Sequence, residues 1–186
     1  MRLVLLIFFT IIPLSISAEN SVNSPKHHLP NGTYTNTSGI ANESSLKEVL
    51  KWSWERRGKK LETFEFETKK PNYQKIYKNE DLTITWIGHE SFLYQNKDIN
   101  ILTDPHFSER ASPLSFAGPK RYMEPGMKID DLPDIDVVTI SHSHYDHLDY
   151  STVKSLSEKF KNILFIVPLG LQKWFEGKGI YNVIEL

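Results

Sequence analysis

Apolar and polar positions follow a regular pattern from residue 82 to the end of the chain. Residues 82–87 alternate and are rich in β-branched side chains, which predicts a strand. Shorter stretches of the same kind, separated by polar turns, predict two more strands at residues 91–95 and 100–103. Further along, the pattern predicts buried strands at 135–140 and 163–167 and the start of one more strand at 181–186. It also predicts helices at 151–160, with Ser151 as the N-cap, and at 171–175. Hairpin-like strands followed by alternating strands and helices predict a layered α/β fold.

Between these regular parts, residues 106–133 show little periodicity and are interrupted by several Pro and Gly residues. A loop of this length inside a compact domain is usually functional or disordered. We therefore expect this loop to contribute to a binding or catalytic site.

The first residues have a different character. Arg2 is followed by an apolar run and then by small residues up to Ala18, which predicts a secretory signal peptide over residues 1–18 and an exported protein, periplasmic or secreted. The run is shorter than a membrane-spanning helix requires. The alternative interpretation is an uncleaved N-terminal anchor, which would leave the protein associated with a membrane.

Two segments separate this leader from the regular part of the chain. Residues 19–45 are rich in Ser, Asn, Thr and Gly and are typical of a flexible linker. Residues 46–79 form an N-terminal extension, for which we expect packing on the domain. Its first part, residues 45–60, predicts a short amphipathic helix. Because this helix carries two Trp residues among basic ones, contact with an anionic membrane surface is the alternative.

The amino-acid composition restricts the kinds of partner and of metal or catalytic site that the chain can have. The 186 residues correspond to about one domain, and 22 Lys and Arg against 23 Asp and Glu give a net charge of -1. The near-neutral charge and the lack of a sustained basic stripe argue against a nucleic-acid partner. The sequence contains no Cys, which excludes disulfide scaffolds, thiolate metal sites and Cys nucleophiles. A metal ion must therefore be held mainly by His, Asp or Glu.

Candidate metal ligands are concentrated directly after the predicted strand at 135–140. His142, His144, Asp146 and His147 lie within six positions. At a strand end, residues two apart point to the same side, so His142 and His144 can hold one ion together. A turn would direct Asp146 and His147 to a second point nearby, where two ions can share a bridging hydroxide. Imidazole and carboxylate ligands suit Zn²⁺, and Fe or Mn remain alternatives.

The motif His-x-His-x-Asp-His resembles the signature of the metallo-β-lactamase superfamily. The segments at residues 86–89, 101–105, 107–113, 116–121 and 131–133 further resemble the family of N-acylphosphatidylethanolamine-hydrolysing phospholipases D. This resemblance implies an αββα sandwich, of which residues 80–186 would be the N-terminal half, and two zinc ions. It also implies hydrolysis of a phospholipid phosphodiester to an N-acylethanolamine and phosphatidic acid.

Several residues receive roles from this resemblance. His142 and His144 would hold the first metal, and Asp146 and His147 the second, with Asp146 also in the catalytic machinery. Tyr145, between the ligands, is a candidate to face the substrate, and packing is its alternative role. Two residues are candidates to support the ligands from behind: Asp104, at the end of a strand, and His89, on a turn. The alternative is a turn-forming role, before Pro105 for Asp104 and as a simple turn residue for His89. His106 is expected at the surface.

The superfamily completes its site with later ligands, a His, an Asp and a final His, and no His follows His147 in these 186 residues. We therefore expect this chain by itself to bind metal weakly and to have little or no hydrolytic activity. Alternative functions are a metallo-hydrolase of a soluble lactone or phosphodiester and a non-catalytic exported metal-binding protein.

Overall fold

The computed structural model describes residues 25–29, 33–38, 45–55, 72 and 81–186. The chain divides into two compact units, Met1–Phe64 and Glu65–Leu186. The predicted signal peptide lies outside the described residues, as do most of the predicted linker and extension. No helix in the described residues has the length and apolar character needed to cross a membrane.

In the first unit, the predicted helix at 45–60 is present as α1 (Leu46–Glu55). Its start is fixed by a reciprocal cap, in which the Glu48 backbone N–H donates to the Ser45 hydroxyl at 3.2 Å and the Ser45 backbone N–H donates to the Glu48 carboxylate at 2.8 Å. This capping box satisfies two backbone donors that a helix start otherwise leaves without partners.

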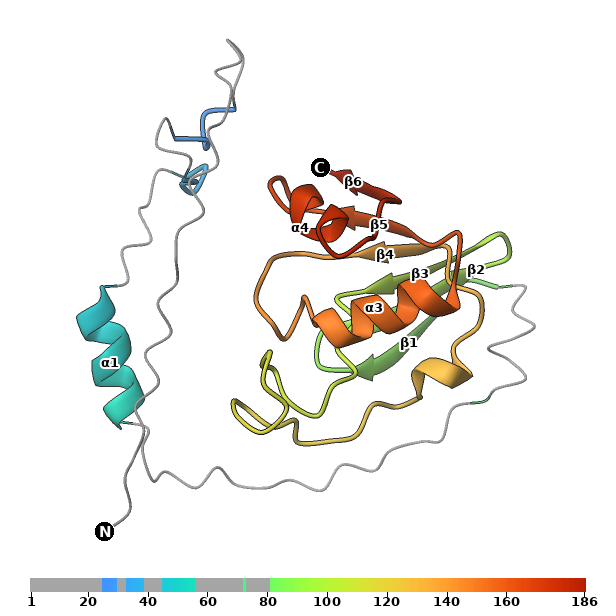
Figure 1. The fold of residues 1–186 in the computed structure, drawn as a ribbon, viewed down its shortest axis with the longest axis horizontal. Helices are drawn as coiled ribbons and strands as arrows, with labels where there is room; N and C mark the ends of the chain where they lie inside the picture. Colours follow the sequence, from blue (N-terminus) through green and yellow to red (C-terminus); the bar gives the residue numbers. More distant parts are fainter. Residues whose placement is uncertain (1–24, 30–32, 39–44, 56–71, 73–80) are drawn as a thin grey trace. The chain divides into compact units, whose positions relative to one another are not determined.

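The second unit has the element order predicted from the sequence (Figure 1). Its elements are β1 (Thr83–Gly88), β2 (Ser91–Asn96), β3 (Ile99–Thr103), the short 3-10 helix η1 (Ile129–Asp131), β4 (Val137–Thr139), α3 (Tyr150–Lys159), β5 (Leu164–Val167), α4 (Gln172–Glu176) and β6 (Val183–Glu185). The strand predicted at 135–140 is confirmed but shorter, and the long loop contains only η1.

The six strands form one sheet in the order β1-β2-β3-β4-β5-β6. The first three strands pair antiparallel, as hairpins do, and the pairs from β3 to β6 are parallel. Parallel pairing of β3 and β4 brings the carboxyl ends of both strands to the same edge of the sheet. This edge is where the sequence motif begins.

One face of the sheet carries the core, under α3 and α4 in Figure 1. Leu93, Leu102, Val138 and Phe165 point into this core and are completely buried. On the opposite face, the apolar side chains of β1 are largely exposed, with Ile84 at 58% and Trp86 at 53%. A single sheet with helices on one face corresponds to half of the layers of the predicted αββα sandwich.

Asp149 begins α3, and the prediction that Ser151 caps this helix is wrong. The Asp149 carboxylate accepts hydrogen bonds from the Ser151 backbone at 3.2 Å and from the Thr152 hydroxyl at 2.6 Å. It also accepts from the Ser108 backbone at 3.0 Å, which ties the long loop to the helix. Burial alone would raise the pKa of Asp149, but these hydrogen bonds outweigh it and hold the pKa below its usual value.

Asp149→Ala is expected to lower the free energy of unfolding by about 2–4 kcal/mol, because the cap is lost and buried donors lose their acceptor. Chemical denaturation measures this change. Since the folded-state pKa of Asp149 is depressed, its contribution is complete above the pKa of the unfolded carboxyl and declines as the pH falls through the lower folded value. Glu158→Ala, at an exposed position of the same helix, is the matched control and should cost less than about 0.5 kcal/mol.

Candidate metal centre

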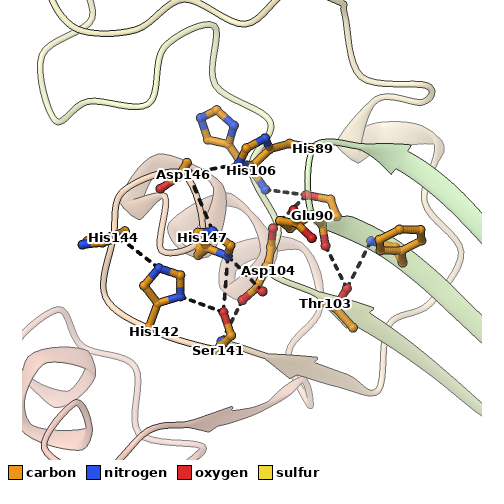
Figure 2. A network of polar contacts seen from close by, with 12 residues as sticks. His89, Glu90, Thr103, Asp104, His106, Ser141, His142, His144, Asp146 and His147 are labelled. Atoms are coloured by element: carbon orange, nitrogen blue, oxygen red, sulfur yellow. Dashed lines mark hydrogen bonds and ion pairs between the residues drawn. The ribbon is translucent and has the colours of Figure 1, made fainter. Parts of the chain in front are cut away.

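The motif forms a tight loop between β4 and α3 (Figure 2). After His144 the chain turns, with the backbone N–H groups of His147 and Leu148 both donating to the His144 carbonyl, at 3.0 and 2.7 Å. This turn brings the second half of the motif back beside the first, as the spacing of the residues predicts. The four predicted ligands therefore come together at the edge of the sheet.

The first predicted pair is in direct contact. His142 Nε2 lies 3.0 Å from His144 Nδ1. The His142 ring also lies against the His147 ring, with centroids 4.0 Å apart. The two predicted pairs are thus parts of one cluster of imidazoles, open to solvent on the side of His144.

The second predicted pair is joined by a residue from another turn. Asp146 Oδ2 lies 3.6 Å from His147 Nε2 and 3.0 Å from His89 Nε2. One ligand atom from each of these three residues lies within 4.8 Å of the others, which makes them a group able to hold a metal ion. His89 comes from the turn between β1 and β2 and has a positive φ of 52°.

These separations fit metal ligation. Two ligands on a tetrahedral zinc ion, with bonds of about 2.0–2.2 Å, lie about 3.3 Å apart. The three donor-to-donor distances of 3.0, 3.0 and 3.6 Å bracket this value. The ligand set of imidazole and carboxylate, without thiolate, also suits a zinc hydrolase site. The described residues therefore fit the metal that the motif predicts.

Asp104 contacts His147 as the sequence predicted for a supporting residue. Its Oδ2 lies 3.0 Å from His147 Nδ1, which leaves His147 Nε2 free to face Asp146. Its Oδ1 accepts from the Ser141 backbone N–H at 2.7 Å. A carboxylate behind a ligand imidazole fixes the tautomer and orientation of the ring.

Ser141 is a site residue that the sequence analysis did not identify. Its hydroxyl lies 2.9 Å from His142 Nδ1 and 3.3 Å from His147 Nδ1, so it contacts the rear nitrogen of two candidate ligands. The only signal in the sequence is its position directly before the first His of the motif. Such a signal is weak, because Ser is common at strand ends.

The electrostatics of the cluster favour the forms that bind metal. Burial lowers the pKa of His142, and the neighbouring His147 and His144 lower it further, so its imidazole stays neutral. Burial would raise the pKa of Asp146, but the hydrogen bond from His89 and the nearby His147 hold it below its usual value. A neutral imidazole and an ionised carboxylate are the states that coordinate a cation.

The surroundings of Tyr145 and of His106 differ from those of the candidate ligands. Burial raises the pKa of Tyr145, with Asp149 adding to the effect, while the backbone of Tyr150 acts in the opposite direction. Tyr145 is therefore a half-buried neutral phenol near the start of α3. The expectation that His106 is a surface residue is wrong, since only 3% of it is exposed. The chain bends at Asp104. Next to this bend, the His106 backbone N–H donates to the buried Ser91 hydroxyl.

Comparison with known proteins shows what this site resembles. Residues 99–186 match the family described as Beta-lactamase superfamily domain. The matched segment carries the complete His-x-His-x-Asp-His motif and is therefore similar to the domains of that superfamily.

Three curated proteins are similar to part of the chain. Over 99 residues, 53% of this chain, it is 48% identical to N-acyl-phosphatidylethanolamine-hydrolyzing phospholipase D 1 of Caenorhabditis elegans. It is 35% identical over 102 residues, 55% of the chain, to the mitochondrial N-acyl-phosphatidylethanolamine-hydrolyzing phospholipase D of Saccharomyces cerevisiae. A metal-dependent hydrolase of Methanopyrus kandleri is 29% identical over 105 residues, 56% of the chain. The matches cover 28%, 21% and 39% of these relatives. Because each match covers only part of the relative, the relatives together support a metallo-hydrolase. Such an enzyme implies a metal cofactor.

Asp104→Ala is expected to weaken binding of Zn²⁺ to the chain by about 10- to 100-fold, because His147 loses the acceptor that orients it. Isothermal titration calorimetry measures the dissociation constant. Asp98→Ala, which removes an exposed carboxylate from the turn between β2 and β3, should leave it unchanged. Equal affinities for the two variants would show that Asp104 does not support the metal ligands.

Proposed function

We propose that the protein is a zinc-dependent phosphodiesterase that hydrolyses N-acylphosphatidylethanolamine. The observation that carries this proposal is the convergence of His142, His144, Asp146 and His147 at one sheet edge, in a segment similar to phospholipases with that activity. Because the chain spans a minor part of those relatives, the activity is proposed for the protein in which these residues function.

The residues of the cluster have distinct tasks in this reaction. His142 and His144 would hold one zinc ion, and Asp146 and His147 the second. Bound zinc supplies a nucleophilic water at neutral pH and polarises a phosphoryl oxygen. Asp104 and Ser141 keep the rear nitrogens of the imidazoles occupied, so that the front nitrogens face the ions. Tyr145 remains a protonated hydroxyl at neutral pH and is a candidate donor to the substrate.

The long loop supports a lipid substrate over a soluble one. Within this loop, Phe116 is 76% exposed and Tyr122 is 77% exposed. Aromatic side chains of this kind interact well with the interface of a lipid layer, where one end of the ring is apolar and the other polar. We therefore include phospholipid as the substrate and contact with a membrane surface in the proposal. Export through the leader at residues 1–18 is part of the same proposal.

The test compares three substrates: dispersed N-acylphosphatidylethanolamine, a soluble phosphodiester and a lactone. Both the 186-residue chain and the product of its full reading frame are assayed. The full product should release phosphatidic acid and N-acylethanolamine, lose activity with a chelator and regain it with Zn²⁺. His144→Ala should reduce the rate by more than about 100-fold, and His27→Ala, in the other unit, should leave it unchanged.

Other outcomes separate the alternatives. Cleavage of the lactone or the soluble diester without cleavage of the lipid would replace the proposed substrate and keep the metallo-hydrolase. Zinc binding by the full product without turnover of any substrate would contradict the enzymatic function and favour a non-catalytic metal-binding protein.

A further inference from the structure

We propose that His89 is a third protein ligand of the ion held by Asp146 and His147, and that His106 orients it. This inference rests on the proposed metal-dependent function and deepens it. It gives His89 a direct bond to the ion, in place of the supporting role predicted from the sequence. The three ligands would then all come from residues 89–147.

The Nε2 atom of His89 already faces Asp146, one of the two residues expected to hold the second ion. Its Nε2 lies 3.0 Å from Asp146 Oδ2, the same oxygen that lies 3.6 Å from His147 Nε2. Both separations are close to the distance of about 3.3 Å between two ligands on tetrahedral zinc. The rings of His89 and His147 lie near each other, with centroids 5.7 Å apart. One small cation can therefore contact all three residues with minor adjustment of the side chains.

The backbone holds His89 in this position without help from the metal. The His89 carbonyl accepts a hydrogen bond of 2.8 Å from the Trp86 indole. Its left-handed conformation, φ 52°, follows Gly88 with φ 140°, and together they form the tight turn that directs the ring toward the motif. Strained backbone of this kind at a cluster of chemical groups points to a functional constraint.

The second, independent observation concerns His106, whose ring lies near the His89 ring. His106 is 97% buried, since only 3% of it is exposed, and its Nε2 has no hydrogen-bond partner among the described residues. Its ring stands edge-on to the His89 ring, with centroids 6.3 Å apart. Figure 2 draws the two residues next to each other. A buried polar nitrogen without a partner is costly. With a metal ion bound at His89 Nε2, the ring proton lies on Nδ1, and a bridging water or a small ring movement would bring this N–H to His106 Nε2.

His147 already shows the arrangement that we propose for His89. There, Asp104 accepts from the rear nitrogen of the imidazole and leaves the front nitrogen to face Asp146. His106 follows Asp104 by two positions after the end of β3, and its ring stands edge-on to the His89 ring. Ligand imidazoles in metal sites almost always donate their other N–H to such a partner. The end of β3 would thus orient both imidazoles of one site.

Titration of the full 186-residue chain with Co²⁺, followed by its visible absorption bands, tests the assignment. The wild type should show intense bands of a four-coordinate ion. His89→Ala should weaken Co²⁺ binding by at least about 10-fold and reduce these bands, because one nitrogen ligand is lost. His27→Ala removes an imidazole from the other unit and should bind as the wild type does.

The proposal that His106 orients His89 needs a measurement that does not change when a substitution merely disturbs the packing around residue 106. In the zinc-loaded chain, ¹⁵N NMR should show the His89 ring protonated at Nδ1 and metal-bound at Nε2. His106→Gln keeps an acceptor and should preserve this signature. His106→Leu should weaken zinc binding by about 10-fold and alter the His89 signal, while thermal melting of the metal-free proteins reports any damage to the fold.

Unchanged Co²⁺ affinity and spectrum in His89→Ala, together with loss of binding in His147→Ala, would overturn this inference and leave the proposed function intact. Because this chain by itself is expected to bind metal weakly, the titration is continued to a high concentration of Co²⁺. Failure of the wild type to bind Co²⁺ or Zn²⁺ even at that concentration would overturn the inference and would also count against the proposed function. If His106→Gln changes the ¹⁵N NMR signal of His89 as much as His106→Leu does, then His106 does not orient His89.

Discussion

The position of the Asp104 carboxylate is the constraint on which the site depends. Its backbone N–H donates to the Thr139 carbonyl at 2.8 Å, and its carbonyl accepts from the Ser91 hydroxyl at 2.7 Å. Its side chain contacts the Ser141 backbone and the His147 ring. One residue at the end of β3 thus links β2, β4 and the metal motif. Its φ of 37° is uncommon for a residue with a side chain and is maintained by these contacts.

The sheet explains how residues far apart in the sequence meet at one site. Parallel pairing of β3 and β4 places Asp104 and Ser141 next to each other, although 36 positions of sequence lie between them. The hairpin of β1 and β2 brings His89 to the same edge. Metal binding by His89 and the motif, supported by Asp104, would therefore be coupled to the folding of the sheet, because these side chains meet only when the strands pair.

Much of this arrangement could be predicted from the sequence. The strands at 82–87 and 163–167 show clear patterns, since one has alternating and the other continuous apolar residues. The four candidate ligands of the motif could be picked out because their spacing is rare and has a chemical meaning. The predicted contact of Asp104 with one of these candidates is present, because a strand predicted next to the site ends there.

Other features depend on contacts that a linear sequence does not reveal. The burial of His106 follows from how the loop after β3 packs on β2, which no local pattern indicates. Asp149 caps α3 instead of Ser151 because it also binds the long loop, a contact between residues 41 positions apart. The proximity of His89 to Asp146 spans 57 positions and results from the pairing of strands.

The central claim is that the imidazoles and the carboxylate of residues 142–147 hold metal ions at the edge of this sheet. A crystal structure of the zinc-loaded protein, with anomalous diffraction recorded at the zinc edge, tests it most directly. The account predicts zinc bonded to His147 and Asp146, with His142 and His144 around the neighbouring position. Zinc found only at other residues, such as His27 and His28, with the motif imidazoles turned away from one another, would contradict it.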